Sequence, residues 1–164
     1  MVKVLFVCHG SICRSPMAEF IMKDMIRERG LDSWIEASSA ATSTEELGNP
    51  VYPPARRKLA EHGIRCDGHY ARRLRADDYK KYDYLIGMDR YNIRNILRLT
   101  GSDPEGKVRK LTEFAGMSGD IDDPWYTGDF ETVYHQIVKG CEGLITELTR
   151  RKGEKDHPGK KKRV

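Results

Sequence analysis

The chain opens with a short apolar run, a loop that contains glycine, and a proline, in that order. Residues 2–19 read VKVLFVCHGSICRSPMAE. The unbroken apolar run up to Val7 predicts a buried strand, because strands covered on both faces do not alternate with polar residues. Pro16 suits the first position of a helix, where its missing N–H leaves no hydrogen bond unmade. The stretch therefore predicts a strand, a loop and a helix.

The rest of the chain repeats this alternation of strand and helix. The first helix is expected to stop at Gly30, because apolar residues recur at helical spacing up to that point. Strands that alternate with helices predict an α/β domain, with a four-stranded parallel sheet and helices on both faces. The further elements are expected in this order: a strand at 35–40, a helix from Pro53 to Gly63, a strand at 83–88, a helix at 91–99, a weaker strand at 107–111, and a final helix from Phe130 to Leu148.

The length and composition fit one domain with a hydrophobic core. The 164 residues are 38% hydrophobic and 33% charged, which excludes a disordered polyelectrolyte. The apolar run near the N-terminus is too short for a signal peptide or a membrane span, so we expect a cytoplasmic protein without a membrane partner. Four cysteines in such a chain are expected to be thiols, and their spacing completes no zinc site.

The positive charge of the chain is concentrated at its C-terminus. Residues 150–164 hold eight Lys or Arg against Glu154 and Asp156, which gives this segment a net charge of +6. Because the whole chain has a net charge of +4, residues 1–149 carry a net charge of −2. We expect a domain over 1–149 followed by a basic, flexible tail over 150–164. No platform of aromatic and basic residues accompanies the tail, so no specific nucleic-acid partner is expected.

The loop at residues 8–15 has the features of a site for a nucleophile and a phosphate group. Backbone N–H groups before a helix point into the loop and the helix dipole adds positive potential, so the hollow favours an anion. Arg14 supplies a planar guanidinium suited to two phosphate oxygens. The same field stabilises a thiolate at Cys8. Cys8 is therefore the candidate nucleophile.

Two other residues of this loop have two interpretations each. Ser15 either donates its hydroxyl to the thiolate or caps the helix. Gly10 either adopts a backbone conformation closed to other residues or is simply a flexible loop glycine. No Gly-Lys-Ser/Thr of the Walker type is present, which disfavours nucleotide hydrolysis at a P-loop.

A transfer to sulfur also needs a proton for the departing oxygen, and residues 120–126 hold the best candidate acid. They read DIDDPWY. Asp123 precedes two aromatic residues, Trp125 and Tyr126, which can wall a pocket for an aromatic substrate. The plainer interpretation is a turn with packed aromatic side chains. The spacing alone leaves both open.

Taken together and in this order, the two motifs resemble the low-molecular-weight protein-tyrosine-phosphatase family. The resemblance covers about residues 2–148 and leaves only the basic tail unmatched. It implies a four-stranded parallel α/β fold that needs no metal and no cofactor. It also implies a tyrosine-phosphorylated protein or peptide as substrate, with phosphate and other oxyanions as inhibitors.

The resemblance implies a role for each matching residue. Cys8 would attack phosphorus to form a cysteinyl-phosphate while Arg14 and the loop N–H groups hold the oxygens. Asp123 would protonate the leaving phenol and then activate water. Ser15 would hold the thiolate, and Cys13 matches a second loop cysteine that can form a protecting disulfide with the nucleophile. The implied substrate-binding residues are His9, Gly10, Ser11, Ile12, Cys13, Ser15, Trp125 and Tyr126.

Three positions depart from the pattern of the family. Ser11 stands where an Asn usually bonds a supporting histidine that matches His69, so that link is expected to be water-mediated or lost. His9 replaces an apolar residue and either brings a titrating charge to the phosphate or points to the surface. Glu45 stands where many members carry an aromatic, so one wall of the cleft is expected to be polar.

Three alternative functions were weighed against this interpretation. Relatives that dephosphorylate phosphoarginine carry a Thr where this chain has Ile12, and an apolar side chain there disfavours that substrate. Thioredoxin-coupled arsenate reductases use two further cysteines close together, whereas Cys66 and Cys141 are far apart in the sequence. A non-catalytic phosphate-binding module would be expected to lack the nucleophile or the acid, and both Cys8 and Asp123 are present.

Overall fold

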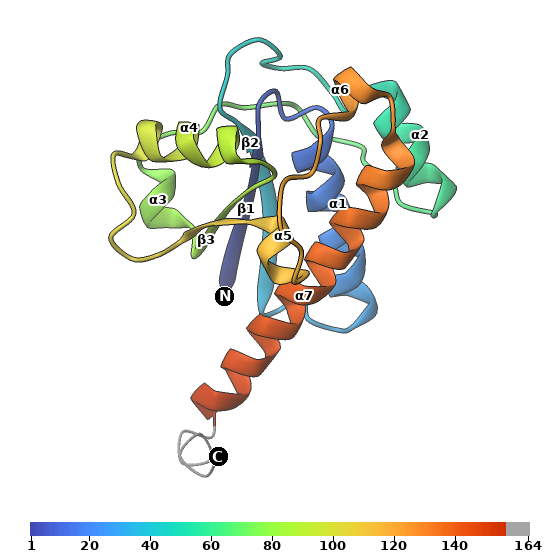
Figure 1. Ribbon diagram of the computed structural model, residues 1–164. Helices are drawn as coiled ribbons and strands as arrows, with labels where there is room; N and C mark the ends of the chain where they lie inside the picture. The colour runs from blue at the N-terminus through green and yellow to red at the C-terminus, as the bar shows by residue number, and fades with distance from the viewer. Residues whose placement is uncertain (157–164) are drawn as a thin grey trace.

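The computed structural model describes residues 1–156, in which a parallel sheet lies between two layers of helices (Figure 1). The strands are β1 (Val2–Cys8), β2 (Ile35–Ala41), β3 (Tyr84–Gly87) and β4 (Val108–Lys110), and they lie side by side in the order β2-β1-β3-β4. The helices are α1 (Arg14–Glu28), α2 (Pro53–Glu61), α3 (Asp78–Lys81), α4 (Arg90–Thr100), α5 (Leu111–Phe114), α6 (Pro124–Thr127) and α7 (Phe130–Asp156). All strand pairs are parallel. The predicted α/β fold with a four-stranded parallel sheet is confirmed.

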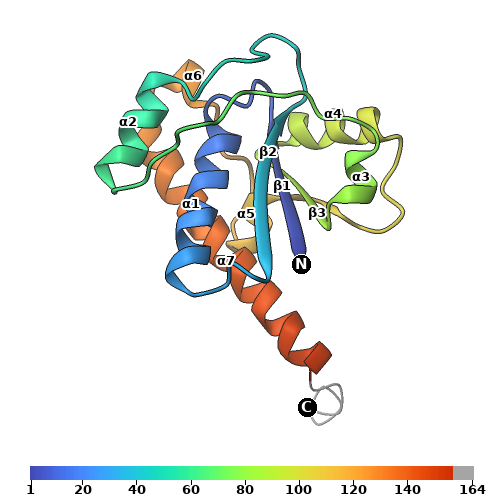
Figure 2. The same ribbon diagram turned by 180° about the vertical axis from the view of Figure 1, so that it is seen from behind.

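The central strand β1 supplies both hydrophobic cores. Side chains of a strand alternate between faces, and Val4 and Phe6 pack on the α1, α2 and α7 side while Leu5 and Val7 pack on the α3 and α4 side. All four are fully buried. Figure 2 shows the two layers from behind, with the sheet between them. This double burial explains why the sequence of β1 is continuously apolar.

Helix α7 buries the stripe that its sequence predicts. Val133, Ile137 and Leu144 are at most 2% exposed and pack against α1 and the sheet. Its glycines let α5 come close, because a Cβ at Gly143 would overlap the carbonyl oxygen of Phe114. The helix continues to Asp156, so the domain boundary predicted at 149 falls inside it. Residues 157–164, the rest of the predicted tail, lie outside the described residues.

Several element boundaries differ from the predicted ones. Helix α1 begins at Arg14, two residues before Pro16, because the loop closes directly onto the helix and the Met17 N–H donates to the Cys13 carbonyl. Helix α2 ends at Glu61 and β4 is only three residues long. The one-turn helices α3, α5 and α6 were not predicted, since a single turn is too short to show periodicity.

None of the helices within residues 1–156 is long and apolar enough to cross a bilayer.

The candidate site lies where the sheet ends. The carboxyl ends of parallel strands meet at one edge, and the loops after β1, β2 and β3 gather there. The loop after β2 is tied to the loop after β1, because the Thr42 N–H donates to the Cys8 carbonyl and the Ser43 N–H to the His9 carbonyl. The segment 120–126 and α6 reach the same edge at the top of Figure 1.

Candidate active site

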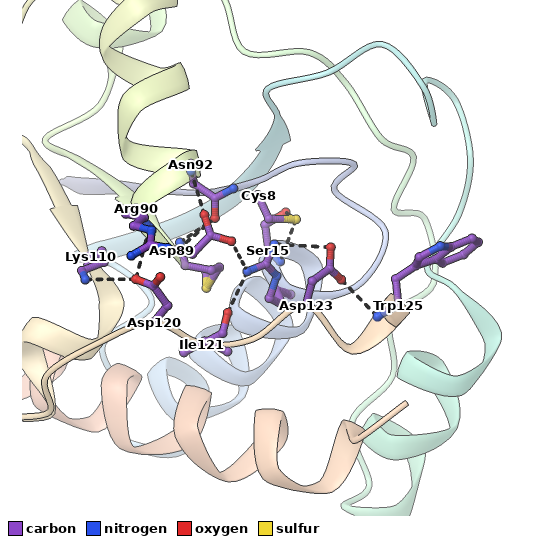
Figure 3. A network of polar contacts seen from close by, with 12 residues as sticks. Cys8, Ser15, Asp89, Arg90, Asn92, Lys110, Asp120, Ile121, Asp123 and Trp125 are labelled. Carbon is purple, nitrogen blue, oxygen red and sulfur yellow. Dashed lines mark hydrogen bonds and ion pairs between the residues drawn. The ribbon is translucent and has the colours of Figure 1, made fainter. Parts of the chain in front are cut away.

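Cys8 ends β1 with its sulfur inside the loop. The residue is 3% exposed. Two backbone groups donate to its Sγ, the Ser11 N–H at 3.3 Å and the Ser15 N–H at 3.4 Å. The Ser15 Oγ lies 3.2 Å from the same sulfur, and no side chain caps α1 (Figure 3). Ser15 therefore sits at the sulfur and not at the helix cap, and the N–H groups favour negative charge on Cys8.

The sharp turn of the loop is made at Ser11 and not at Gly10. Ser11 has a φ of 55°, in the left-handed region that L residues seldom adopt. Within residues 1–156, every other residue with a positive φ is a glycine. Gly10 has no such φ, so its expected special conformation is wrong. A Cβ at Gly10 would instead lie 3.2 Å from the Glu46 side chain. The strain of the turn is thus carried by a serine.

Two hydrogen bonds brace this strained turn. The Ser15 hydroxyl donates to the Ser11 Oγ at 2.8 Å, and His69 Nε2–H donates to the Ser11 carbonyl oxygen at 2.7 Å. His69 is itself buried beside Glu19, whose Oε1 accepts from the Ser39 hydroxyl at 2.5 Å. No bond joins the side chains of His69 and Ser11, and His69 instead binds the main-chain carbonyl of Ser11, in place of the asparagine link that was expected to be water-mediated or lost.

Arg14 is buried and held by three oxygens. Its Nη1 donates to Asp89 Oδ2 at 2.7 Å and to the Ile121 carbonyl at 2.8 Å, and its Nη2 lies 3.6 Å from Asp123 Oδ2. Burial alone would lower the pKa of Arg14, but the negative charges of Cys8 and Asp89 raise it. The guanidinium therefore stays charged at the mouth of the loop.

Asp89 is a site residue that the sequence reasoning missed. It is the N-cap of α4, where its Oδ1 accepts from the Asn92 N–H at 2.8 Å while Oδ2 binds Arg14. A signal was present, since an Asp directly after β3 starts a helix at the edge where the strands end. The sequence does not reveal that the second carboxylate oxygen of Asp89 binds Arg14.

Asp123 and the aromatic residues come from the segment around α6. Asp123 caps that helix through a bond from the Trp125 N–H to its Oδ1 at 3.1 Å, and its other oxygen faces Arg14. The Trp125 ring packs on Tyr52 with centroids 4.7 Å apart and stays half exposed. Tyr126 is 83% exposed. Asp123 therefore caps a turn, and both aromatic residues line the pocket over the loop.

The pocket over the loop has a volume of ≈ 110 Å³ and brings the two sequence motifs together. Glu45 lies on its wall, and its Oε2 is 2.9 Å from His9 Nε2. Both of these side chains are about half exposed or more, so the His9 side chain lies at the rim of the pocket. Glu46, which the sequence reasoning did not single out, lines the same wall. The lining residues are Cys8, His9, Gly10, Ser11, Ile12, Cys13, Arg14, Glu45, Glu46, Asp123, Trp125 and Tyr126.

Cys13 lies under the pocket as a free, buried thiol. Burial raises its pKa, and the negative charges of Cys8 and Asp123 raise it further. Cys13 therefore keeps its proton across the neutral pH range.

Within residues 1–156, no three His, Cys, Asp or Glu side chains are grouped to hold a metal ion.

A family model described as low molecular weight phosphotyrosine protein phosphatase matches residues 3–154. The chain belongs to this family. The predicted family and the predicted enzyme class, a protein-tyrosine-phosphatase, are thereby confirmed. Members of the low molecular weight phosphatase family that resemble this chain include curated bacterial proteins and solved structures.

The low molecular weight protein-tyrosine-phosphatase YfkJ of Bacillus subtilis is 38% identical over 93% of this chain and 99% of its own length, and its crystal structure superposes with a TM-score of 0.90. The low molecular weight protein-tyrosine-phosphatase PtpA of Staphylococcus aureus is 37% identical over 92% of this chain and 96% of its own length. A Drosophila arginine phosphatase is 30% identical over 90% of this chain and 98% of its own, with a TM-score of 0.82. The fold is therefore shared by phosphatases named for different phosphoamino acids.

Proposed function

We propose that this chain hydrolyses phosphotyrosine in proteins or peptides through a cysteinyl-phosphate intermediate. One observation carries the proposal: Asp123, which is far from Cys8 and Arg14 in the sequence, lines the same small pocket as these two loop residues. The proposal needs no metal and no cofactor, because the loop N–H groups and Arg14 supply the positive charge that the phosphate requires.

In the first step, the Cys8 thiolate attacks phosphorus and the bond to the tyrosyl oxygen breaks. Arg14 and the loop N–H groups hold the three remaining phosphate oxygens, as preorganised donors do for developing charge. Asp123, protonated, gives its proton to the departing phenolate oxygen. The products of this step are a free tyrosine hydroxyl and phosphate bonded to the Cys8 sulfur.

In the second step, Asp123 acts in the opposite sense. Its carboxylate takes a proton from a water molecule as that water attacks the cysteinyl-phosphate. The S–P bond breaks, inorganic phosphate leaves and the Cys8 thiolate is restored. The Ser15 backbone N–H, 3.4 Å from the sulfur, stabilises the thiolate as it leaves. Inorganic phosphate and other tetrahedral oxyanions are then expected to compete with the substrate.

The preference for tyrosine rests on the walls of the pocket. Ile12 and Trp125 offer apolar contact to a phenyl ring, and Trp125 is itself supported by Tyr52. Ile12 carries no hydroxyl that would orient an amide or a water beside phosphorus, which argues against phosphoarginine. An arsenate reductase would need a further mobile thiol. Cys141 is fully buried. Cys66 does not line the pocket, and burial raises the pKa of its thiol.

The mechanism is tested by turnover of p-nitrophenyl phosphate and phenyl phosphate. We expect Cys8→Ser to abolish turnover and Cys66→Ser to retain it. Asp123→Asn is expected to slow phenyl phosphate by about 10²- to 10⁴-fold and p-nitrophenyl phosphate much less, because the better leaving group needs no proton. Asp122→Asn, its exposed neighbour, is the matched control. Residual turnover by Cys8→Ser would contradict the mechanism.

The substrate is tested with a panel of matched peptides that carry phosphotyrosine, phosphoserine or phosphoarginine. We expect the highest kcat/KM for the phosphotyrosine peptide. A higher kcat/KM for phosphoarginine would transfer the same mechanism to that substrate. Arsenate turnover that depends on added thiol would favour the reductase function instead.

A further inference from the structure

Three cavities meet at His9, and they differ in charge. The catalytic pocket contains carboxylates, Glu45, Glu46 and Asp123 among them. A second cavity on the α4 side also contains carboxylates, including Asp120 and Asp122. The third has a volume of ≈ 160 Å³ and contains none. We call it the arginine pocket, and its polar lining is His9, Thr42, Ser43, Arg73, Asn95 and Arg98.

The two arginines of this pocket have no carboxylate partner within residues 1–156. Arg73 and Arg98 occur in none of the ion pairs of the described chain, and the Arg98 guanidinium donates only to the neutral Asn95 side chain. By contrast, Arg72, next to Arg73 in the sequence, is paired with Asp78. Two unpaired guanidinium groups around one hollow favour an oxyanion there.

The arginine pocket is built from backbone that is fixed to the catalytic loop. Arg73 forms a parallel bridge with Ala41 at the end of β2. The next two residues, Thr42 and Ser43, donate their N–H groups to the Cys8 and His9 carbonyls at 3.0 Å each. Another wall is helix α4, which carries Asn95 and Arg98 and is capped by Asp89. The pocket therefore keeps a fixed place beside the nucleophile.

We propose that the arginine pocket binds a second oxyanion of the substrate, a carboxylate or phosphate on a residue close to the phosphotyrosine. The inference rests on the proposed function. His9 directly follows Cys8 and separates the two pockets, so neighbouring residues of one extended peptide can reach both. Glu45 already engages the His9 ring, which leaves Arg73 and Arg98 to supply the charge.

The test compares phosphotyrosine peptides that differ at one residue. Glutamate, phosphoserine or glutamine is placed in turn at each of the positions within two residues of the phosphotyrosine, and kcat/KM is measured at low ionic strength. At the best position we expect about a three- to ten-fold higher kcat/KM for an anionic residue than for glutamine, since exposed ion pairs are individually weak. The glutamate and phosphoserine peptides separate the carboxylate from the phosphate source.

The ratio of the two kcat/KM values is then measured in variants, because a ratio cancels any change in the catalytic site itself. In Arg73→Gln/Arg98→Gln we expect the ratio to fall to about one. Arg75→Gln removes an exposed arginine of the same segment that does not line the pocket, and it is expected to keep the wild-type ratio. Added salt is expected to reduce the wild-type ratio.

Binding provides a second readout without turnover. Titration of the inert Cys8→Ser protein with the anionic and neutral peptides is expected to show the same preference, and the added arginine substitutions are expected to remove it. A wild-type ratio near one at every position, or a preference that survives in the double variant, overturns the inference. Failure of the proposed function looks different, because the wild-type protein would then not hydrolyse p-nitrophenyl phosphate at all.

Discussion

The ion pair between Asp89 and Arg14 is predicted to raise kcat/KM, although Asp89 does not line the pocket over the loop. The change that isolates it is Asp89→Asn, because asparagine is as good an N-cap for α4 as aspartate but carries no charge. Arg14 is 2% exposed, and Asp89 Oδ2 lies 2.7 Å from its Nη1. Removing one partner of a buried ion pair outright costs about 3–5 kcal/mol.

The expected loss is smaller than that range because two other acceptors remain. The Ile121 carbonyl at 2.8 Å and the Asp123 carboxylate at 3.6 Å still face the guanidinium of Arg14. A charged hydrogen bond contributes about 1.5–3 kcal/mol, so we expect a loss of about 2 kcal/mol. If the transition state loses about 2 kcal/mol of stabilisation by Arg14, kcat/KM falls about 30-fold.

The assay is kcat/KM for p-nitrophenyl phosphate, together with urea unfolding of each variant. Asp120→Asn is the matched control, since Asp120 pairs with Lys110 and not with Arg14, and it is expected to change kcat/KM less than about two-fold. Asp89→Ala also removes the helix cap and is expected to lose about 1 kcal/mol more stability than Asp89→Asn. A folded Asp89→Asn protein with wild-type kcat/KM would refute the reasoning.

Three further predictions concern pH, packing and oxidation. Burial alone would raise the pKa of Asp103, but hydrogen bonds from Tyr79 and from backbone N–H groups lower it below its ordinary value of 3.8. The carboxylate of Asp103 therefore stabilises the fold above that pH. Asp103→Asn is expected to lose about 1–2 kcal/mol in urea unfolding at pH 7, and the difference from wild type is expected to shrink as the pH falls below about 4. Gly143→Ala is expected to lose at least about 1–3 kcal/mol in the same assay, because its Cβ would overlap the Phe114 carbonyl. The raised pKa of Cys13 predicts that iodoacetamide at pH 7–8 labels Cys8 and spares Cys13, as mapped by mass spectrometry; Cys13→Ser is expected to turn thiol-reversible inactivation by peroxide into permanent loss.

Each of these has an outcome that would count against it. A pH-independent difference for Asp103→Asn would mean that its charge does not stabilise the fold. For the glycine prediction, Gly153→Ala is the control, because nothing lies within 4 Å of its added Cβ, and equal stability losses in both variants would refute the packing argument. Equal recovery of wild type and Cys13→Ser under thiol would remove the protective role of Cys13.

The sequence predicts the sheet and the catalytic loop because both leave local signals. The strand β1 is a continuous apolar run, and helix α7 carries a long stripe at helical spacing. The order of the strands, by contrast, is a property of pairing between distant segments, and no local pattern records it. The one-turn helices escape prediction for the related reason that they contain too few residues for a period to appear.

The candidate site was predicted in its chemistry and missed in its support. Cys8, Arg14 and Asp123 could be named because nucleophile, cation and acid are residue types with known uses. Asp89 was missed because its role depends on a contact with Arg14, 75 residues away in the sequence. A special backbone conformation is one of the two interpretations that the sequence allows for Gly10, because glycine adopts a positive φ freely, whereas the structure places a positive φ at Ser11 and braces it with partners that the sequence does not reveal.

The bond from His69 to the loop ends on a peptide carbonyl, and every amino acid has one. Mutational drift at position 11 therefore leaves this brace intact, provided that the new residue accepts the left-handed turn, as asparagine and glycine do and valine or isoleucine do not. Such an exchange keeps the bond from His69, and of the two braces only the bond from Ser15 to the Ser11 Oγ depends on the side chain. Evolution can therefore vary the side chain at this position and still keep one of the two braces of the loop around the sulfur.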